Sequence, residues 1–266
     1  MSNYWQERIA KQQEALSKKN KKQIDAELKK YYSNSMLKIL GQFEATYNKV
    51  LLSTAEGKEP TPADLYKLDT YWQMQSQLRA ELRKLGEKQA TVLSKQFEIQ
   101  FFDIYFSIAI EGLTAFNTID SRIVEQMINQ IWCADGKSWS ERIWDNTEKL
   151  LEALNANLIH CVVTGKKTTE LKNLLMEQFN VSYRRAEMLV RTELAHIQTT
   201  AAAQRYQDYG LTYYEIQGNE DDSCGGKAID CHELDGKVFR YSDMRTGVNA
   251  PPFHPNCKCC ILPVVD

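Results

Sequence analysis

Long hydrophobic runs are missing from this sequence of 266 residues. The longest apolar stretches, such as residues 108–110, are far shorter than the roughly 20 residues that a helix needs to cross a bilayer. Residues 1–22 also lack the apolar core of a secretory signal peptide. The sequence therefore predicts neither an integral membrane protein nor a classically secreted one.

Glycine and proline are scarce, with 12 and 6 residues, and both gather near the C-terminus. Four prolines lie within residues 251–263, and five glycines lie within residues 218–247. Five of the seven cysteines fall within residues 224–260. Because glycine and proline interrupt regular structure, we expect a helical body followed by an irregular, cysteine-rich tail.

Net charge is small as well, at −2 for the whole sequence, but it is unevenly distributed. Residues 1–100 contain 17 Lys and Arg against 12 Asp and Glu, and the rest of the chain is acidic. A basic front and an acidic back indicate two functional halves. The basic excess is too small to make nucleic-acid binding the leading hypothesis, and a lysine-rich arm that contacts DNA is the smaller alternative.

Strong helix formers and helical spacing of apolar side chains dominate the chain up to Gly210. Residues 1–52 predict one long helix, or a helical pair that Gly41 interrupts. Further helices are expected over about 63–110, 119–131, 139–164, 168–179 and 182–209, and strands over 211–216, 236–241 and 259–262. The fold class is therefore mainly α, with a small α+β unit of short strands and Cys/His-rich turns at the C-terminus.

Cysteine and histidine in the tail occur in a pattern that suits a metal site. A structural zinc ion takes about four thiolate or imidazole ligands in a tetrahedron. Four of the following five residues are the candidate ligands: Cys224, Cys231, His254, Cys257 and Cys259. A short tail has little core of its own, so bound zinc would stabilise it. The spacing between Cys224 and Cys231 is wider than the usual gap of about two to four residues.

Two alternatives to zinc binding remain for these cysteine and histidine side chains. The thiols and imidazoles could be uncoordinated groups packed in a compact, turn-rich unit. A disulfide could instead join Cys224 or Cys231 to the cysteines within 257–260 if the protein leaves a reducing cytosol. The odd cysteine count and the missing signal peptide favour metal binding over a disulfide framework.

One acidic side chain shares the apolar stripe of the helix expected over residues 182–209. Glu193 lies at helical spacing from Val190 and Ile197. A carboxylate on an apolar face is costly unless it is paired or hydrogen-bonded. We therefore expect Glu193 to belong to a structural ion pair or polar core, with Arg191 and Asp222 as further members. A catalytic carboxylate is the less favoured alternative.

Sequence motifs of common enzyme classes are missing. There is no nucleophile elbow, Walker loop, dinucleotide-binding glycine pattern or H-E-x-x-H zinc motif. A cysteine nucleophile with a histidine base is formally possible, but clustered cysteines are more often ligands than nucleophiles. The sequence predicts no catalytic residues. The alternative is a metal-dependent hydrolase or nuclease-like effector that uses Glu193, Asp222 and His254.

The motifs of the tail also occur together in a fixed order. They are Arg191-Thr192-Glu193 on a helix, Asp222-x-Cys224, Cys231 before Leu234-Asp235-Gly236, and His254-Pro255-Asn256-Cys257-Lys258-Cys259. This combination resembles the head morphogenesis, or minor capsid, proteins of tailed bacteriophages over residues 136–263. Their shared C-terminal unit is named after the F protein of phage Mu. The sequence departs from that family in the wider first cysteine pair and in Lys258, where arginine is common.

The resemblance implies a non-enzymatic virion component that is made in the host cytoplasm and lies inside the head near the portal. It implies docking on the portal protein in support of head assembly, DNA packaging or DNA delivery. Further partners are the major capsid or scaffolding protein and packaged DNA, which the basic N-terminal helices would contact, with no membrane involved. It assigns residues 133–266 to the Mu F-like domain, with the Cys/His cluster in 219–266, and residues 1–132 to an N-terminal helical arm or bundle. Some family members carry a fused toxin enzyme, and none is expected here because the sequence ends soon after the shared unit.

Overall fold

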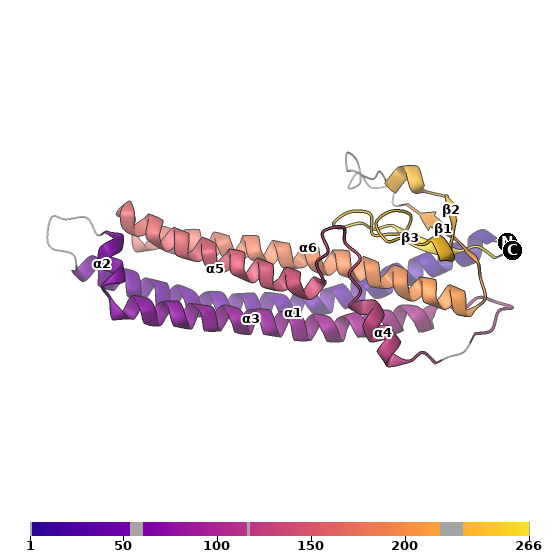
Figure 1. Ribbon diagram of the computed structural model, residues 1–266, viewed down its shortest axis with the longest axis horizontal. Coiled ribbons are helices and arrows are strands. Elements are labelled where there is room, and N and C mark those ends of the chain that lie inside the picture. The colour runs from indigo at the N-terminus through magenta and orange to yellow at the C-terminus, as the bar shows by residue number, and fades with distance from the viewer. Residues whose placement is uncertain (1, 54–60, 116–117, 219–230, 266) are drawn as a thin grey trace. The chain divides into compact units, whose positions relative to one another are not determined.

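The computed structural model describes residues 2–53, 61–115, 118–218 and 231–265, which form six α-helices and three short strands (Figure 1). The helices are α1 Ser2–Ser53, α2 Pro62–Tyr66, α3 Asp69–Ser107, α4 Ser121–Ile128, α5 Trp139–Val163 and α6 Thr168–Asp208. The strands are β1 Tyr213–Gln217, β2 Val238–Arg240 and β3 Cys260–Pro263, and short 3-10 helices cover Cys231–Leu234 and Tyr241–Asp243. The predicted fold class, mainly α with a small α+β unit, is confirmed. None of the described helices combines the length and the apolar character needed to span a bilayer.

Contacts within the chain define two compact units, and each combines segments that are far apart in sequence. The helical unit consists of Ala26–Thr91 and Ser140–Ala186. The tail unit consists of Met1–Asp25, Val92–Trp139 and Glu187–Asp266. Long helices therefore contribute residues to both units. The predicted boundary between residues 132 and 133 stays a prediction.

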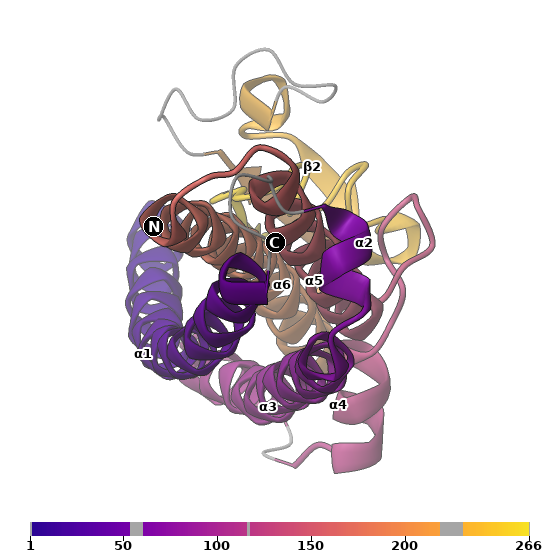
Figure 2. The same cartoon turned by 90° about the vertical axis from the view of Figure 1, so that its left-hand side faces the viewer.

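The helical unit is a bundle of segments of α1, α3, α5 and α6 that run alongside one another (Figures 1 and 2). Phe43, Leu82 and Leu154 are buried among the apolar side chains that face its centre. Some polar groups in this core are paired: the side-chain amide of Asn146 donates to the Tyr32 hydroxyl (3.1 Å) and to the Ser182 carbonyl (2.9 Å). Apolar burial supplies the stability, and these hydrogen bonds avoid the cost of unpaired buried groups.

The tail unit contains a three-stranded antiparallel sheet in the order β2-β1-β3. Tyr214 and Ile216 on the central strand β1 are fully buried, and their neighbours are less so, as expected for a strand with one face on the core. Ile216 pairs with Ile261 of β3, and Tyr214 pairs with Phe239 of β2. This register holds the cysteine-rich loop before β3 close to α6.

Two helices are longer than the sequence predicts. The structure shows one α1 that continues through Gly41, because Leu40 and Phe43 beside it are buried and offset the roughly 1 kcal/mol cost of a helical glycine. It also shows one α6 where two helices are expected around Asn180. Ser182 does not cap a new helix there but lies buried in the helical unit.

After Thr61 the structure shows two shorter helices where one long helix is expected over residues 63–110. The Thr61 hydroxyl accepts the Asp64 N–H (3.3 Å), and the Asp64 carboxylate accepts the Thr61 N–H (3.0 Å). This reciprocal capping box starts α2 at Pro62. The helix ends at Tyr66, and α3 begins at Asp69.

Candidate functional site

Four of the five candidate metal ligands lie together in the tail unit. Cys231 begins the first 3-10 helix, and His254, Cys257 and Cys259 lie in the loop before β3. All four side chains are buried. Nε2 of His254 lies 3.6 Å from Sγ of Cys231, and the Cys259 thiol is hydrogen-bonded with Cys257 and Cys231. The structure therefore brings together residues from two turns that are more than twenty positions apart.

The hydrogen bonds of His254 define its neutral tautomer. Nδ1 lies 2.9 Å from the carbonyl oxygen of Pro255, which can only accept a hydrogen bond. The proton therefore resides on Nδ1, and Nε2 is left with a lone pair that faces the Cys231 thiol. An imidazole held in this way is oriented either to accept a thiol hydrogen bond or to ligate a metal ion.

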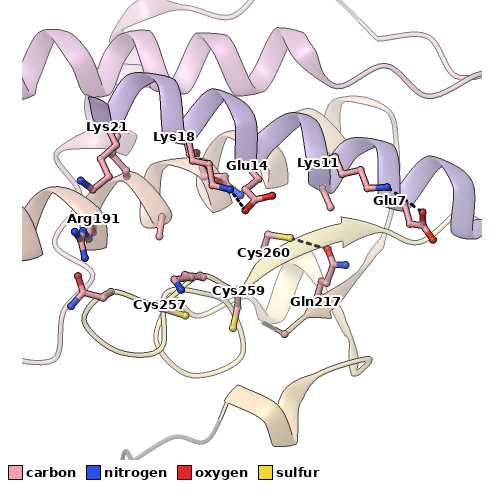
Figure 3. Close-up of a pocket in the computed structure, with 18 residues that line it drawn as sticks. Glu7, Lys11, Glu14, Lys18, Lys21, Arg191, Gln217, Cys257, Cys259 and Cys260 are labelled. Carbon is pink, nitrogen blue, oxygen red and sulfur yellow. Dashed lines mark hydrogen bonds and ion pairs between the residues drawn. The ribbon is translucent and has the colours of Figure 1, made fainter. Parts of the chain in front are cut away.

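Cys257 and Cys259 differ in acidity because they share one hydrogen bond. The bond from the Cys259 thiol lowers the pKa of Cys257 to about 6, against the opposing effect of burial. Donation of the same bond, together with burial, raises the pKa of Cys259 far above its ordinary value. The shared hydrogen bond therefore makes Cys257 the more acidic thiol of the pair. Figure 3 shows both residues on the loop that faces α1.

Cys224 and Asp222 lie outside the described residues. Cys260 points elsewhere, with its thiol 3.4 Å from the Gln217 side-chain oxygen (Figure 3), and burial raises its pKa to about 12. No disulfide joins any of the six described cysteines.

The described residues alone do not form a metal site. Among them, no three His, Cys, Asp or Glu side chains are placed so that they could hold a metal ion. The cluster of Cys231, His254, Cys257 and Cys259 is therefore described as a buried, hydrogen-bonded group of soft donors. Zinc binding by this set with Cys224 stays a prediction.

The three side chains of the motif Arg191-Thr192-Glu193 on α6 lie in three different environments. Arg191 is exposed and lines a cavity beside α1. The Thr192 hydroxyl donates to the Met188 carbonyl (2.8 Å) and accepts the backbone N–H of Asn256 (3.2 Å). That second bond fixes the cysteine-rich loop to the helix at a residue with positive φ (62°). Thr192 thus connects the motif on α6 with the motif in the loop.

Glu193 is buried, at 3 % exposure, as the apolar stripe predicts. Its carboxylate accepts the indole N–H of Trp132 at 3.1 Å. The Trp132 ring stacks on His196, with 4.9 Å between centroids. This hydrogen bond offsets part of the cost of burying the carboxyl group. Arg191, which the sequence pattern assigns to the same group, is exposed. The assignment of Glu193 to a structural ion pair or polar core stays a prediction.

The sequence motifs do not identify Trp132 and His196, the two residues next to Glu193. His196 follows Glu193 by three positions, so both side chains lie on one face of α6, and this spacing is the available signal. Trp132 is distant in sequence and lies after α4, where no local pattern connects it with α6. Arg205, another arginine on this helix, packs over the rings of Tyr105 and Tyr209.

Comparisons with known proteins give a family match for part of this chain. Residues 152–262 match the family model described as "Phage Mu protein F like protein", a segment that begins in α5, contains all of α6 and ends in β3. NAD(+)--arginine ADP-ribosyltransferase EFV of Enterococcus faecalis is 22% identical over 291 aligned positions, covering 99% of this chain and 55% of that protein. The chain thus spans about half the length of this curated relative. No solved structure matches the chain significantly. The family match confirms the resemblance to phage head morphogenesis proteins.

Proposed function

Because residues 152–262 form a phage Mu protein F-like segment, we propose that this chain is a head morphogenesis protein of a tailed phage. The family match is the observation that carries the proposal. The contacts of the motif residues support a structural role: Thr192 holds the cysteine-rich loop, and Glu193 holds Trp132. Polar residues that could be mistaken for an active site thus have partners that stabilise the fold.

The chain would act as a minor, non-enzymatic component inside the head, next to the portal protein. The helical unit supports a docking role, since at least five of its large apolar side chains are exposed. They are Leu37 (66 %), Leu52 (86 %), Tyr66 (42 %), Trp72 (59 %) and Val163 (51 %). Tyr66 and Trp72 are held rigidly, because the Trp72 indole N–H donates to the Tyr66 carbonyl at 3.0 Å. Rigid aromatic side chains lose little entropy on binding, which favours them at protein interfaces.

The other partners follow from the same assembly role. The major capsid or scaffolding protein would meet the chain during head formation. Packaged DNA would meet the basic N-terminal region, where residues 1–100 carry the positive excess. These contacts would support packaging or delivery of DNA without any membrane step.

Quantitative mass spectrometry of purified particles tests the proposal. We expect a low, fixed number of copies per portal ring. Substituting Leu52→Ser together with Trp72→Ser should lower that number while the purified chain stays folded. Val248→Ser is the matched control, because Val248 is similarly exposed (59 %) but belongs to the tail unit. Absence of the chain from particles, although it is made in infected cells, would overturn the proposal.

Zinc is the cofactor that the tail sequence predicts, and it is a separate proposal. Cys231, His254, Cys257 and Cys259 supply the soft donors, and Cys224 completes the predicted set. Elemental analysis of the chain, purified without chelators, should find zinc in a fixed ratio to protein that Cys257→Ser lowers. Protein that is fully folded and free of zinc would leave the cluster as packed thiols.

The metal-dependent hydrolase alternative gains no support from the described residues. Glu193 accepts a hydrogen bond from Trp132, and His254 contacts Cys231 and Pro255. Asp222 lies outside the described residues. Glu193→Gln should therefore alter stability and assembly rather than abolish a reaction.

A further inference from the structure

A cavity of about 750 Å³ lies within the tail unit, next to the cysteine-rich loop. One wall is the N-terminal part of α1, from Glu7 to Lys21. The second wall is α6, and the third is formed by the end of β1 and residues 256–260 (Figure 3). We call this cavity the α1 groove. Its size falls in the range of about 300–1,000 Å³ that is usual for ligand sites.

Basic side chains line the α1 groove on all three walls. Its lining contains five basic side chains and two acidic ones. The basic residues are Lys11, Lys18 and Lys21 of α1, Arg191 of α6 and Lys258 of the loop. The acidic residues, Glu7 and Glu14, are on α1 and pair with Lys11 (3.7 Å) and Lys18 (2.6 Å). Lys21 pairs with Asp25, so all three lining lysines of α1 have acidic partners. The lining stays net cationic, and Arg191 and Lys258 are the basic residues of the two walls that carry no acidic lining residue.

The uncharged part of the lining has two features. Ala10, Leu194 and Ala195 give an apolar floor, and the amide side chains of Gln198 and Gln217 lie among them. The described residues that line the groove include no aromatic ring. Sites for single-stranded nucleic acid use aromatic side chains on which bases stack, and duplex DNA is too wide to enter such a cavity. The lining thus fits an anionic ligand that is not a nucleobase.

We infer that the α1 groove binds an extended acidic peptide segment of a partner protein. Carboxylates would meet Arg191, whose planar guanidinium can bind a carboxylate through two hydrogen bonds, and Lys258. Amide side chains would bond the peptide backbone, and apolar side chains of the peptide would contact Ala10 and Leu194. Glu7 and Lys21 are separated by about 21 Å along the helix, which accommodates about six extended residues. The site is independent of the assembly role proposed above.

A selection experiment on the full-length chain tests this inference. A displayed library of random hexapeptides is selected against the wild-type chain and, in parallel, against the double variant Arg191→Glu, Lys258→Glu. We expect Asp and Glu to be enriched only on the wild type. The selected peptides should bind the double variant at least about tenfold more weakly in fluorescence anisotropy, since each lost contact is a charge-assisted hydrogen bond. Their affinity should also fall as salt increases.

Matched variants and competitors make the outcome decisive. Lys22→Glu reverses a charge on the turn of α1 that holds Lys21, but Lys22 is exposed and does not line the groove. It should leave binding unchanged, and thermal unfolding should show that every variant is folded. Equal enrichment of acidic residues on both baits would overturn the inference, as would no enrichment or equal weakening by Lys22→Glu. Stronger groove binding by an oligothymidine or by pyrophosphate than by the peptides would make the site a phosphate site instead.

Discussion

Single residues in the tail unit show how polar motif positions stabilise the fold. The sequence pattern predicts that Glu193 is buried, because the residue lies on an apolar stripe, and the structure places it there. The partner could not be predicted, because Trp132 is brought to α6 by tertiary structure. Local periodicity indicates which face of a helix is buried, but it does not indicate what covers that face.

Removing the acceptor at Glu193 should destabilise the chain. Glu193→Leu leaves the part-buried Trp132 indole N–H without this partner, at a cost of about 0.5–1.5 kcal/mol. Glu193→Gln keeps a side-chain oxygen that can accept the bond and should cost less. Urea unfolding at neutral pH measures both changes. Equal stability of the Leu variant and the wild type would show that this hydrogen bond contributes nothing net.

His196 should make stability depend on pH. Burial lowers the pKa of His196 to about 4 from an ordinary value of 6.5, and neither ring nitrogen has a hydrogen-bond partner among the described residues. As pH falls below 6.5 the unfolded chain binds a proton that the folded chain excludes, so stability decreases until about pH 4. The full loss is about 3 kcal/mol, at about 1.4 kcal/mol per pKa unit. Urea unfolding between these pH values measures it.

His196→Phe is the control for this pH dependence. The phenyl ring can keep the stacking contact with Trp132 and removes two buried nitrogens that lack partners in the described structure. The variant should be at least as stable as the wild type near neutral pH and should lose the part of the slope that His196 causes. An unchanged slope in the variant would assign the pH dependence to other groups.

At the scale of elements, a chain of polar side chains joins three helices in the tail unit. The Gln13 amide donates to the Tyr206 hydroxyl (3.3 Å), and the Gln198 amide donates to Gln13 (3.1 Å). Three further bonds continue the chain, from Ser17 to Gln198 (2.6 Å), from Gln100 to Ser17 (2.6 Å) and from Asn20 to Gln100 (2.7 Å). A sliding helix would break several of these bonds at once. The network therefore specifies the register of α1 against α3 and α6.

Helix positions could be predicted from sequence far better than helix ends. The helical spacing identified the segments, and the three strands are close to their expected places. Gly41 and Ser182 were misleading because each is locally suited to a helix end, whereas burial of neighbouring apolar residues continues the helix. Tertiary packing is worth more than one unfavourable residue, and a local pattern does not reveal it.

Two glycines in helices should respond differently to alanine. A Cβ at Gly41 meets no atom within 4 Å, so Gly41→Ala should stabilise the chain by about 0.5–1 kcal/mol through reduced backbone entropy. A Cβ at Gly86 would lie 2.6 Å from the ring of Trp144, which must shift. Gly86→Ala should therefore gain less or lose stability. Thermal unfolding compares the two, and a larger gain at Gly86 would contradict the packing argument.

At the scale of the whole molecule, the segments that form the candidate site are far apart in the sequence. The tail motifs predicted Cys231, His254, Cys257 and Cys259 as metal ligands together with Cys224, and that role stays a prediction. The α1 groove was not predictable, because Lys18 and Arg191 come from opposite ends of the sequence and meet only in the tail unit. Periodicity in one segment carries no information about a wall supplied by another.

The basic front of the chain should bind DNA weakly and with a shallow dependence on salt. Lys18 and Lys21 form i,i+4 pairs with Glu14 and Asp25, so acidic neighbours offset much of the charge on α1. Fluorescence anisotropy with a duplex of about 30 base pairs should give a log–log salt slope of magnitude below about 3, since few phosphates are neutralised.

Glu14→Lys should steepen that slope by about 1–2, because it adds one cation and releases another. Glu98→Lys makes the same charge change on an exposed face of α3 and should alter the slope less if α1 is the DNA-binding element. A steep slope in the wild type that Glu14→Lys leaves unchanged would move DNA contact away from α1.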